Sequence, residues 1–195
     1  HRPSLVKVQA VYDALAATAA AVALVPDLQP SVIAQALQSF KVAGHRGQQV
    51  AEARGIVAID NSKATNPHAA DSALAGHDSV IWVAGGQLKG AEVDDLIARH
   101  AHRLKAVALM GVDRNIIRES VEKHAPGVPI FVTDDTDPQS AMDAVCTWAV
   151  TQASSGDAIV LAPAAASLDM YTGMGQRGVL FAESVSAHLG GVAPK

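Results

Sequence analysis

The sequence has very little of several features that mark particular classes of protein. It contains a single cysteine, Cys146, which excludes an internal disulfide and any metal site built from several cysteines. A lone cysteine fits a reducing compartment, so we expect a cytoplasmic protein. Because Cys146 lies in an apolar helical pattern with Met142, Val145 and Ala149, we expect an inert core thiol rather than a reactive one.

Long apolar runs and concentrated positive charge are also absent. The most apolar stretch, residues 14–25, is flanked by Asp13 and Asp27 and is too short to cross a hydrocarbon layer roughly 30 Å thick. The formal net charge is −4, and the lysines and arginines are scattered, which is not typical of a nucleic-acid-binding surface. We therefore expect a globular protein that binds neither a membrane nor a nucleic acid.

Familiar catalytic motifs are missing as well. The sequence has no G-x-x-x-x-G-K-[ST] phosphate loop, no G-x-S-x-G serine elbow and no convincing Cys/His nucleophile pair. The first residue is His1 rather than Met, and no signal-peptide pattern precedes the first periodic segment. We expect the sequence to begin at a cut in a longer chain.

Apolar spacing predicts two helices near the start. Val8, Val11 and Leu15 recur at helical spacing, and a second helix is predicted for residues 30–39. Such a pair is too small to enclose a core, so its apolar face needs another body to pack against. We place a boundary near Gly44, with an incomplete helical segment at residues 1–44 and one domain at residues 45–195.

The domain after Gly44 alternates short β-rich runs with helical segments. Most of the β-rich runs are apolar at consecutive positions, which is typical of parallel strands buried on both faces. Residues 48–53 and the Arg54-Gly55 turn predict a hairpin that adds one antiparallel edge strand. The pattern predicts an α/β, Rossmann-like, mostly parallel six-stranded sheet. The other strands are predicted at residues 56–60, 80–84, 106–110, 130–133 and 159–162, and helices at 67–74, 91–100, 115–124 and 138–152.

Three polar loops follow predicted strands, and ligands of open parallel sheets bind beyond the carboxyl ends of the strands. In the first, residues 60–67, Asn66 suits a helix N-cap and Pro67 the first helical position. Lys63 and Thr65 border the same helix start, a combination suited to a phosphate or carboxylate. A capped helix beside a solvated lysine explains the same residues.

The second and third loops, residues 85–90 and 163–169, allow similar alternatives. Gly85-Gly86 permits close backbone approach and precedes Lys89, while small residues leave room before Ser167 and Asp169. Ordinary turn chemistry, with Asp169 capping the next turn, also accounts for them.

Other polar groups are weaker candidates. His100 and His102 are two residues apart and face different sides of a helix, which argues against a shared metal. Asp134, Asp135 and Asp137 are expected to cap the helix that follows them and to face water, and Mg²⁺ binding is the alternative for such a cluster. Spacing alone therefore leads to an anion-binding α/β domain.

The loops themselves resemble one protein family, the UDP-N-acetylmuramoyl-L-alanine:D-glutamate ligases, which are the D-glutamate-adding Mur ligases. Residues 60–66, D-N-S-K-A-T-N, are similar to that family's D-S-K-A-T-N segment, and residues 85–90 to its G-G-x-x-K-G. The resemblance covers nearly the whole chain. It extends to His45-Arg46, to residues 161–169, to Gln176-Arg177-Gly178 with Phe181, and to residues 10–17, which resemble a helix of the family's central domain.

The resemblance implies ATP-dependent amide-bond formation. In the family, the carboxylate of UDP-N-acetylmuramoyl-L-alanine is phosphorylated, the amine of D-glutamate attacks the acyl phosphate, and phosphate leaves. The central domain holds the phosphate loop, Mg²⁺ and a modified lysine, so ATP and Mg²⁺ belong to the complete enzyme. The resemblance implies that this chain lacks the N-terminal domain and most of the central domain, and is inactive alone.

The resemblance also implies roles for single residues. One set is expected to bind D-glutamate: Lys89, Ser167 and Leu168 at its carboxylates, with Thr65 and Met174 beside them. Lys63 is expected to face the phosphoryl-transfer centre as the catalytic residue. A second set is expected to border the nucleotide: Arg46, Asp60, Asn61 and Asp13. The chain departs from the family pattern at Ala10, at Asn61, where the family has an acidic residue, and at Met174, a position commonly aromatic.

Two other functions stay open on the sequence. A non-catalytic anion-binding module that has lost its ATPase half fits the changes at Ala10 and Asn61. The second alternative function is that of a sister Mur-type ligase that adds another amino acid. The intact S-K-A-T-N and G-G-x-x-K-G segments favour D-glutamate over this alternative.

Overall fold

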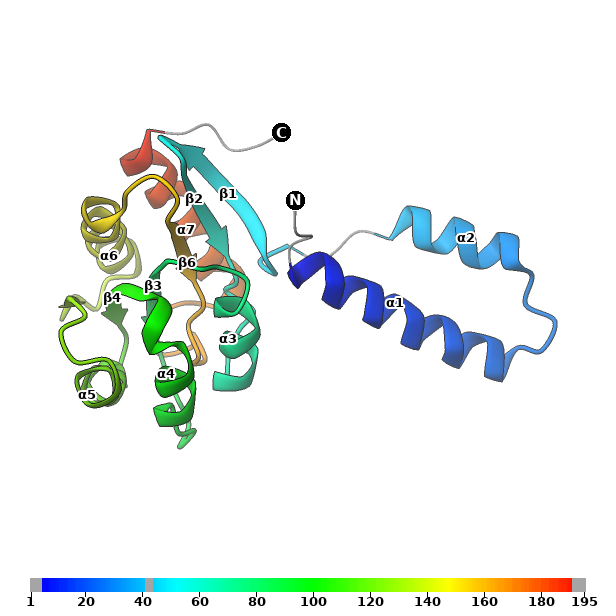
Figure 1. Cartoon of the computed structure of the whole chain (residues 1–195), viewed down its shortest axis with the longest axis horizontal. Coiled ribbons are helices and arrows are strands. Elements are labelled where there is room, and N and C mark those ends of the chain that lie inside the picture. Colours follow the sequence, from blue (N-terminus) through cyan, green and yellow to red (C-terminus); the bar gives the residue numbers. More distant parts are fainter. Residues whose placement is uncertain (1–4, 41–43, 191–195) are drawn as a thin grey trace. The chain divides into compact units, whose positions relative to one another are not determined.

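The computed structural model describes residues 5–40 and 44–190, with side chains described from residue 11 onward. It divides into two compact units, residues 1–44 and 45–195. In the first unit, α1 (Leu5–Leu24) and α2 (Pro30–Ser39) are joined by a short turn (Figure 1), so both predicted helices are confirmed. Among the residues described, no helix combines the length and apolar character needed to span a membrane.

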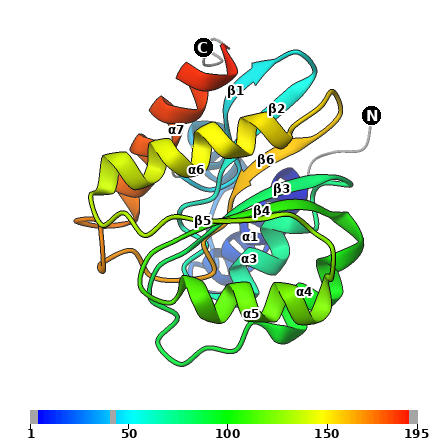
Figure 2. The same ribbon diagram turned by 90° about the vertical axis from the view of Figure 1, so that its left-hand side faces the viewer.

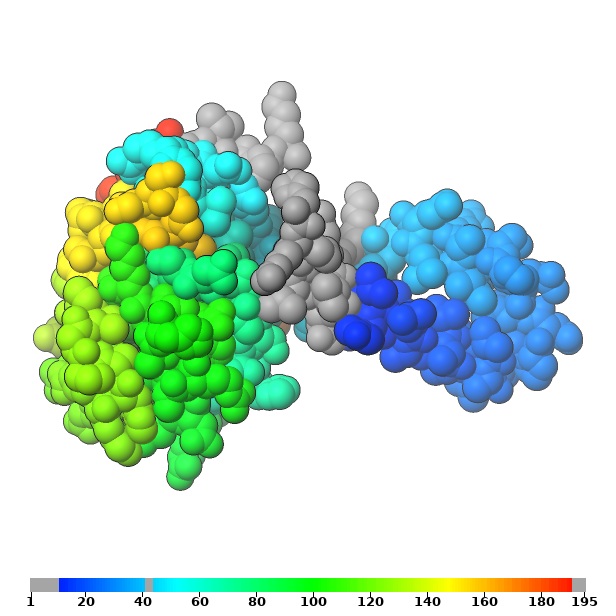
Figure 3. All heavy atoms as spheres, viewed as in Figure 1, coloured from blue at the N-terminus to red at the C-terminus, as the bar shows by residue number. Residues whose placement is uncertain are grey.

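The two helices of the first unit bury none of their described side chains. Val11 is 58% exposed, Leu15 59% and Leu24 83%, and side chains of both helices lie at the surface in the space-filling view (Figure 3). As expected for so small a pair, its apolar residues are not enclosed by the unit itself.

The second unit is built on a six-stranded sheet, and the predicted fold class is confirmed. Only the pair formed by the first two strands is antiparallel, and all the other pairs are parallel. The spatial order is β1 (Gln48–Ala53), β2 (Ile56–Asp60), β6 (Ala158–Leu161), β3 (Val80–Gly85), β4 (Leu104–Met110) and β5 (Ile130–Val132).

The hairpin between β1 and β2 forms as predicted. Its turn residues Arg54 and Gly55 both have positive φ, at 55° and 73°, as expected for a tight turn that matches the twist of the strands. Every residue of β3 and β6 is buried, which explains their unbroken apolar runs.

Helices cover both faces of the sheet, giving three layers (Figure 2). One face packs against α3 (Pro67–Leu74), α4 (Asp94–His100) and α5 (Arg114–His124). The other packs against α6 (Pro138–Gln152) and α7 (Met174–Leu189). Neighbouring side chains of β3 alternate between the layers: Trp82 joins the first core, and Ile81 and Val83 join the second.

Several local predictions hold and two need correction. Cys146 is fully buried, and burial raises the pKa of its thiol to about 12, so the inert-core prediction is confirmed. Asp137 caps α6 through the Ser140 amide at 2.9 Å. The helix predicted from residue 91 begins only at Asp94, because the preceding residues form a turn in which the Ala91 amide donates to the Leu88 carbonyl. Helix α7 was not predicted.

Candidate functional site

Four loops meet at the carboxyl edge of the sheet. Three of them, after β2, β3 and β6, are the predicted ones, and the fourth is the short segment 111–113 between β4 and α5. β6 lies between β2 and β3, so strand order places the three predicted loops side by side. The fourth loop was missed because it carries no lysine or serine to mark it.

Backbone hydrogen bonds join these loops to one another. Gln87 and Ala166 exchange two bonds, with the Gln87 amide 2.9 Å from the Ala166 carbonyl and the reverse pair at 2.8 Å. The Ala164 amide donates to the Ala64 carbonyl at 3.0 Å, and the Asp113 amide donates to the Gly86 carbonyl at 3.1 Å. The edge is therefore one connected surface rather than four independent loops.

Gly86 is required for this close approach. Its φ is 129°, and a Cβ at this position would lie 2.1 Å from the Ala166 carbonyl oxygen. The prediction that the glycine pair lets two backbones meet is confirmed at Gly86.

The first loop begins α3 as predicted. Asn66 is the N-cap, its side chain accepting from the Ala69 amide at 2.9 Å, and Pro67 is the first helical residue. The side chains of Lys63 and Thr65 are half-buried and form no hydrogen bond or ion pair with any described residue. Their polar groups are available for a ligand.

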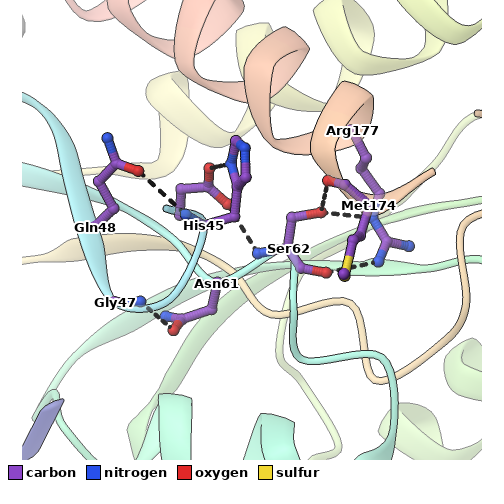
Figure 4. A network of polar contacts seen from close by, with 8 residues as sticks. His45, Gly47, Gln48, Asn61, Ser62, Met174 and Arg177 are labelled. Carbon is purple, nitrogen blue, oxygen red and sulfur yellow. Dashed lines mark hydrogen bonds and ion pairs between the residues drawn. The ribbon is translucent and has the colours of Figure 1, made fainter. Parts of the chain in front are cut away.

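Asp60 and Asn61 are engaged inside the protein. Asp60 is 1% exposed and accepts hydrogen bonds from the Ser62 amide at 2.8 Å, and its other oxygen lies 2.6 Å from His45 Nδ1. The Asn61 Oδ1 accepts from the Gly47 amide at 2.6 Å (Figure 4). Between the two anchored residues His45 and Gly47, the Arg46 side chain is exposed and unpaired within the described chain.

Apart from Thr65 on the first loop, the expected D-glutamate residues lie on the second and third loops and at the start of α7. Lys89 is exposed, has a left-handed φ of 55°, and its ammonium pairs with no described residue. Ser167 is buried, whereas Leu168 is 65% and Met174 41% exposed. The unpaired ammonium of Lys89 is a group that can bind a carboxylate.

Asp169 does not cap the turn that follows it. Its Oδ2 accepts from the Val112 amide on the fourth loop at 2.9 Å. Asp113 makes the reciprocal kind of contact, since its carboxylate accepts from the Leu88 amide at 2.7 Å. The two carboxylates thus fix the fourth loop to its neighbours, a role that sequence spacing did not indicate.

Arg177, on α7, connects three loops and was not singled out as a site residue. Its guanidinium donates to the Ser62 hydroxyl and carbonyl at 3.1 and 3.0 Å (Figure 4). It also donates to the Gly85 carbonyl at 3.3 Å and to the Ala165 carbonyl at 3.1 Å. The side chain is fully buried, and this burial lowers the pKa of the guanidinium to about 10. Only its place in the Q-R-G segment could have drawn attention to it.

The remaining candidates are not on these four loops. Asp13 is on α1, in the first unit, and the side chain of Ala10 falls outside the described residues. His100 is buried and its Nε2 lies 2.9 Å from Asp71. Across the described ranges, no three His, Cys, Asp or Glu side chains gather as metal ligands would.

Comparison with known proteins identifies relatives. Residues 45–165 match the family described as Mur ligase, glutamate ligase domain. A protein of Corynebacterium diphtheriae named UDP-N-acetylmuramoylalanine--D-glutamate ligase is 64% identical over 177 residues, which are 91% of this chain and 37% of that protein. Proteins of the same name from Corynebacterium efficiens and Streptomyces avermitilis are 57% and 45% identical, covering 95% and 90% of this chain and 38% and 37% of those proteins.

The fold is also similar to that of a solved structure, the UDP-N-acetylmuramate-alanine ligase of Thermotoga maritima. The TM-score is 0.59 at 16% identity, with 95% of this chain and 39% of that one covered. The chain spans less than two fifths of the length of the relatives it matches. The resemblance drawn from the loop motifs is confirmed, and the chain belongs to the Mur ligase family.

Proposed function

We propose that this chain forms part of an ATP-dependent ligase that joins D-glutamate to UDP-N-acetylmuramoyl-L-alanine in peptidoglycan synthesis. The proposal is supported by the name shared by relatives up to 64% identical. One observation in the molecule carries it further: the unpaired Lys89 is tied, through the Gln87–Ala166 bridge, to the loop that bears Ser167. A cation on one of two joined loops and a hydroxyl on the other are groups that can bind the carboxylates of a dicarboxylate amino acid.

In this proposal, each free polar group has its own task. Lys89 and Ser167, with Thr65 beside them, bind the carboxylates of D-glutamate and direct its amine toward the activated substrate. Leu168 and Met174 shield that pocket from water with their exposed apolar side chains. Lys63 faces the phosphoryl group and offsets its negative charge during transfer.

The bond changes follow from amide ligation. A carboxylate oxygen of UDP-N-acetylmuramoyl-L-alanine attacks the terminal phosphorus of ATP and releases ADP. The amine of D-glutamate then attacks the acyl carbon, the C–O bond to phosphate breaks, and the amine loses a proton. This chain's residues hold the amino acid and neutralise charge, and the remainder of the enzyme supplies the phosphate loop and the Mg²⁺ ligands.

The residues expected to border the nucleotide differ in how free they are to bind it. The exposed, unpaired Arg46 can donate to phosphate or ribose oxygens. Asp60 and Asn61 already accept hydrogen bonds within the protein, so we assign them the task of holding the Arg46 loop. Asp13 and the rest of residues 1–44 are proposed to belong to the central ATP-binding domain, with residues 45–195 as the C-terminal domain of a cytoplasmic enzyme.

The proposal is tested in a chimaeric ligase. This chain replaces the matching segment of the Corynebacterium diphtheriae relative, and phosphate release is measured with UDP-N-acetylmuramoyl-L-alanine, D-glutamate and ATP. Lys89→Ala removes a charge-assisted contact, so the KM for D-glutamate should rise roughly 10- to 100-fold while the KM for ATP changes little.

Lys123→Ala serves as the matched control, because Lys123 is also an exposed lysine but pairs with Asp94 at the far end of α5. Its kinetic constants should equal those of the parent chimaera. Equal KM values for the Lys89→Ala and Lys123→Ala forms would refute the pocket assignment. A folded chimaera with no ligase activity would instead favour a non-catalytic anion-binding module.

A further inference from the structure

We propose that Arg177 is a positioning residue for D-glutamate: by joining three loops it sets the distance between the lysine and the serine that bind the amino acid. This inference rests on the proposed function and goes beyond it, because Arg177 touches neither substrate nor nucleotide in the assignment above.

The acceptors of Arg177 lie next to the proposed binding residues. Ser62 directly precedes Lys63, and Ala165 is two residues before Ser167. Gly85 begins the loop that carries Lys89. One rigid planar group therefore spans all three segments, and a displacement of any one of them strains a hydrogen bond to the same guanidinium.

The Ser62 hydroxyl extends this connection to the start of α7. It accepts from Arg177 Nε at 3.1 Å and donates to the Met174 carbonyl at 2.7 Å. Met174 is the residue proposed to shield the pocket, so its backbone position also depends on the guanidinium.

The burial of the Arg177 guanidinium argues against a role in stability alone. Arg177 is fully buried, and none of the described carboxylates forms an ion pair with it. Burying a charge without an ion pair costs desolvation free energy, so the burial of Arg177 is a weak source of stability. Its fork of donors, however, fixes several loops at once, which an apolar side chain cannot do.

The test uses Arg177→Lys in the chimaeric ligase. Lysine keeps the positive charge but lacks the planar fork, so it cannot reach three loops together. We expect the KM for D-glutamate to rise roughly 10-fold or more, with the KM for ATP changed less than about threefold. Ser62→Ala, which removes the acceptor of Nε, should shift the KM for D-glutamate in the same direction by a smaller factor.

The matched control is Arg103→Lys. Arg103 also donates to three backbone carbonyls, those of Leu74, Ala75 and His77. It lies just before β4, at the end of the sheet opposite to the carboxyl ends of the parallel strands. This variant should lower the melting temperature and leave both KM values unchanged.

The outcomes separate the two proposals. If Lys89→Ala raises the KM for D-glutamate but Arg177→Lys and Ser62→Ala do not, the positioning inference is wrong and the pocket assignment stands. If Lys89→Ala has no effect, the proposed function itself fails. Should Arg177→Lys not fold, as judged by circular dichroism, the Ser62→Ala result decides the inference alone.

Discussion

Replacing Gly178 with alanine should test how tightly α7 is fitted against the start of the domain. A Cβ on Gly178 would lie 2.2 Å from His45 Nδ1 and 2.6 Å from Asp60 Oδ2, while ordinary contacts begin at 3.4 Å. The His45 ring would have to move by about 1.2 Å, more than its 2.6 Å hydrogen bond to Asp60 can tolerate.

The magnitude follows from three effects. Overpacking a fitted site costs about 1–3 kcal/mol. Losing a hydrogen bond to the buried carboxylate of Asp60 costs about 1.5–3 kcal/mol. Alanine recovers about 0.5–1 kcal/mol through its better helix propensity. The free energy of unfolding should therefore fall by about 2–5 kcal/mol, which corresponds to a melting temperature lower by roughly 5–15 °C.

Urea unfolding followed by tryptophan fluorescence measures this change, because Trp82 and Trp148 both lie in the domain that contains Gly178. Gly175→Ala is the control: it lies on the same helix, and a Cβ there meets no atom of the described residues within 4 Å. Equal unfolding midpoints for the two variants would refute the reasoning about the His45–Asp60 contact.

Three further predictions concern stability and reactivity. Gly86→Ala should lower the free energy of unfolding by roughly 2–6 kcal/mol, because overlap with a carbonyl adds to backbone strain. In a urea titration, the Gly127→Ala variant, whose new Cβ would be strained by a positive φ but would meet none of the described atoms within 4 Å, should lose only about 1–2 kcal/mol. Burial lowers the pKa of His100, so as the pH falls the unfolded chain binds a proton at this residue before the folded chain does. The free energy of unfolding should therefore fall as the pH drops from about 7 to about 5. The decrease in urea midpoint between these two pH values should be smaller for His100→Gln than for the parent protein, and an equal decrease would contradict this. The Cys146 thiol, with its raised pKa, should react with a thiol reagent such as DTNB only in denaturant, and rapid labelling of the native protein would refute its burial.

Much of the fold follows from local sequence signals. The fully buried strand β3 has an unbroken apolar run, and the Asn66-Pro67 pair marks the start of α3 with both cap and first-turn chemistry. Helix α7 escaped prediction because it begins at Met174 after a glycine, with no side-chain cap, and contains Gly175 and Gly178. Glycine lowers helix propensity, so here tertiary packing overrides the local preference.

The candidate site could be predicted best at polar residues that directly follow strands. Lys63 and Lys89 follow strands, and strand ends meet at one edge of a parallel sheet, so their gathering follows from topology. Arg177 is different, because nothing in a helical Q-R-G segment distinguishes a solvated arginine from a buried one. Asp60 shows the same limit: its contact with His45 depends on the space that Gly178 leaves on a helix over a hundred residues later.

The place of β6 in the sheet has a consequence for how the domain is made. This strand is the last in sequence but pairs with β2 on one side and β3 on the other. While the ribosome is still synthesising residues before Ala158, the β1–β2 hairpin and the β3–β4–β5 segment each present an unpaired strand edge, and no sheet pairing joins them. Such edges are prone to pair with other chains. A nascent chain that stalls before β6 is therefore the species most in need of a chaperone, and completion of the sheet waits for the final fifth of the sequence.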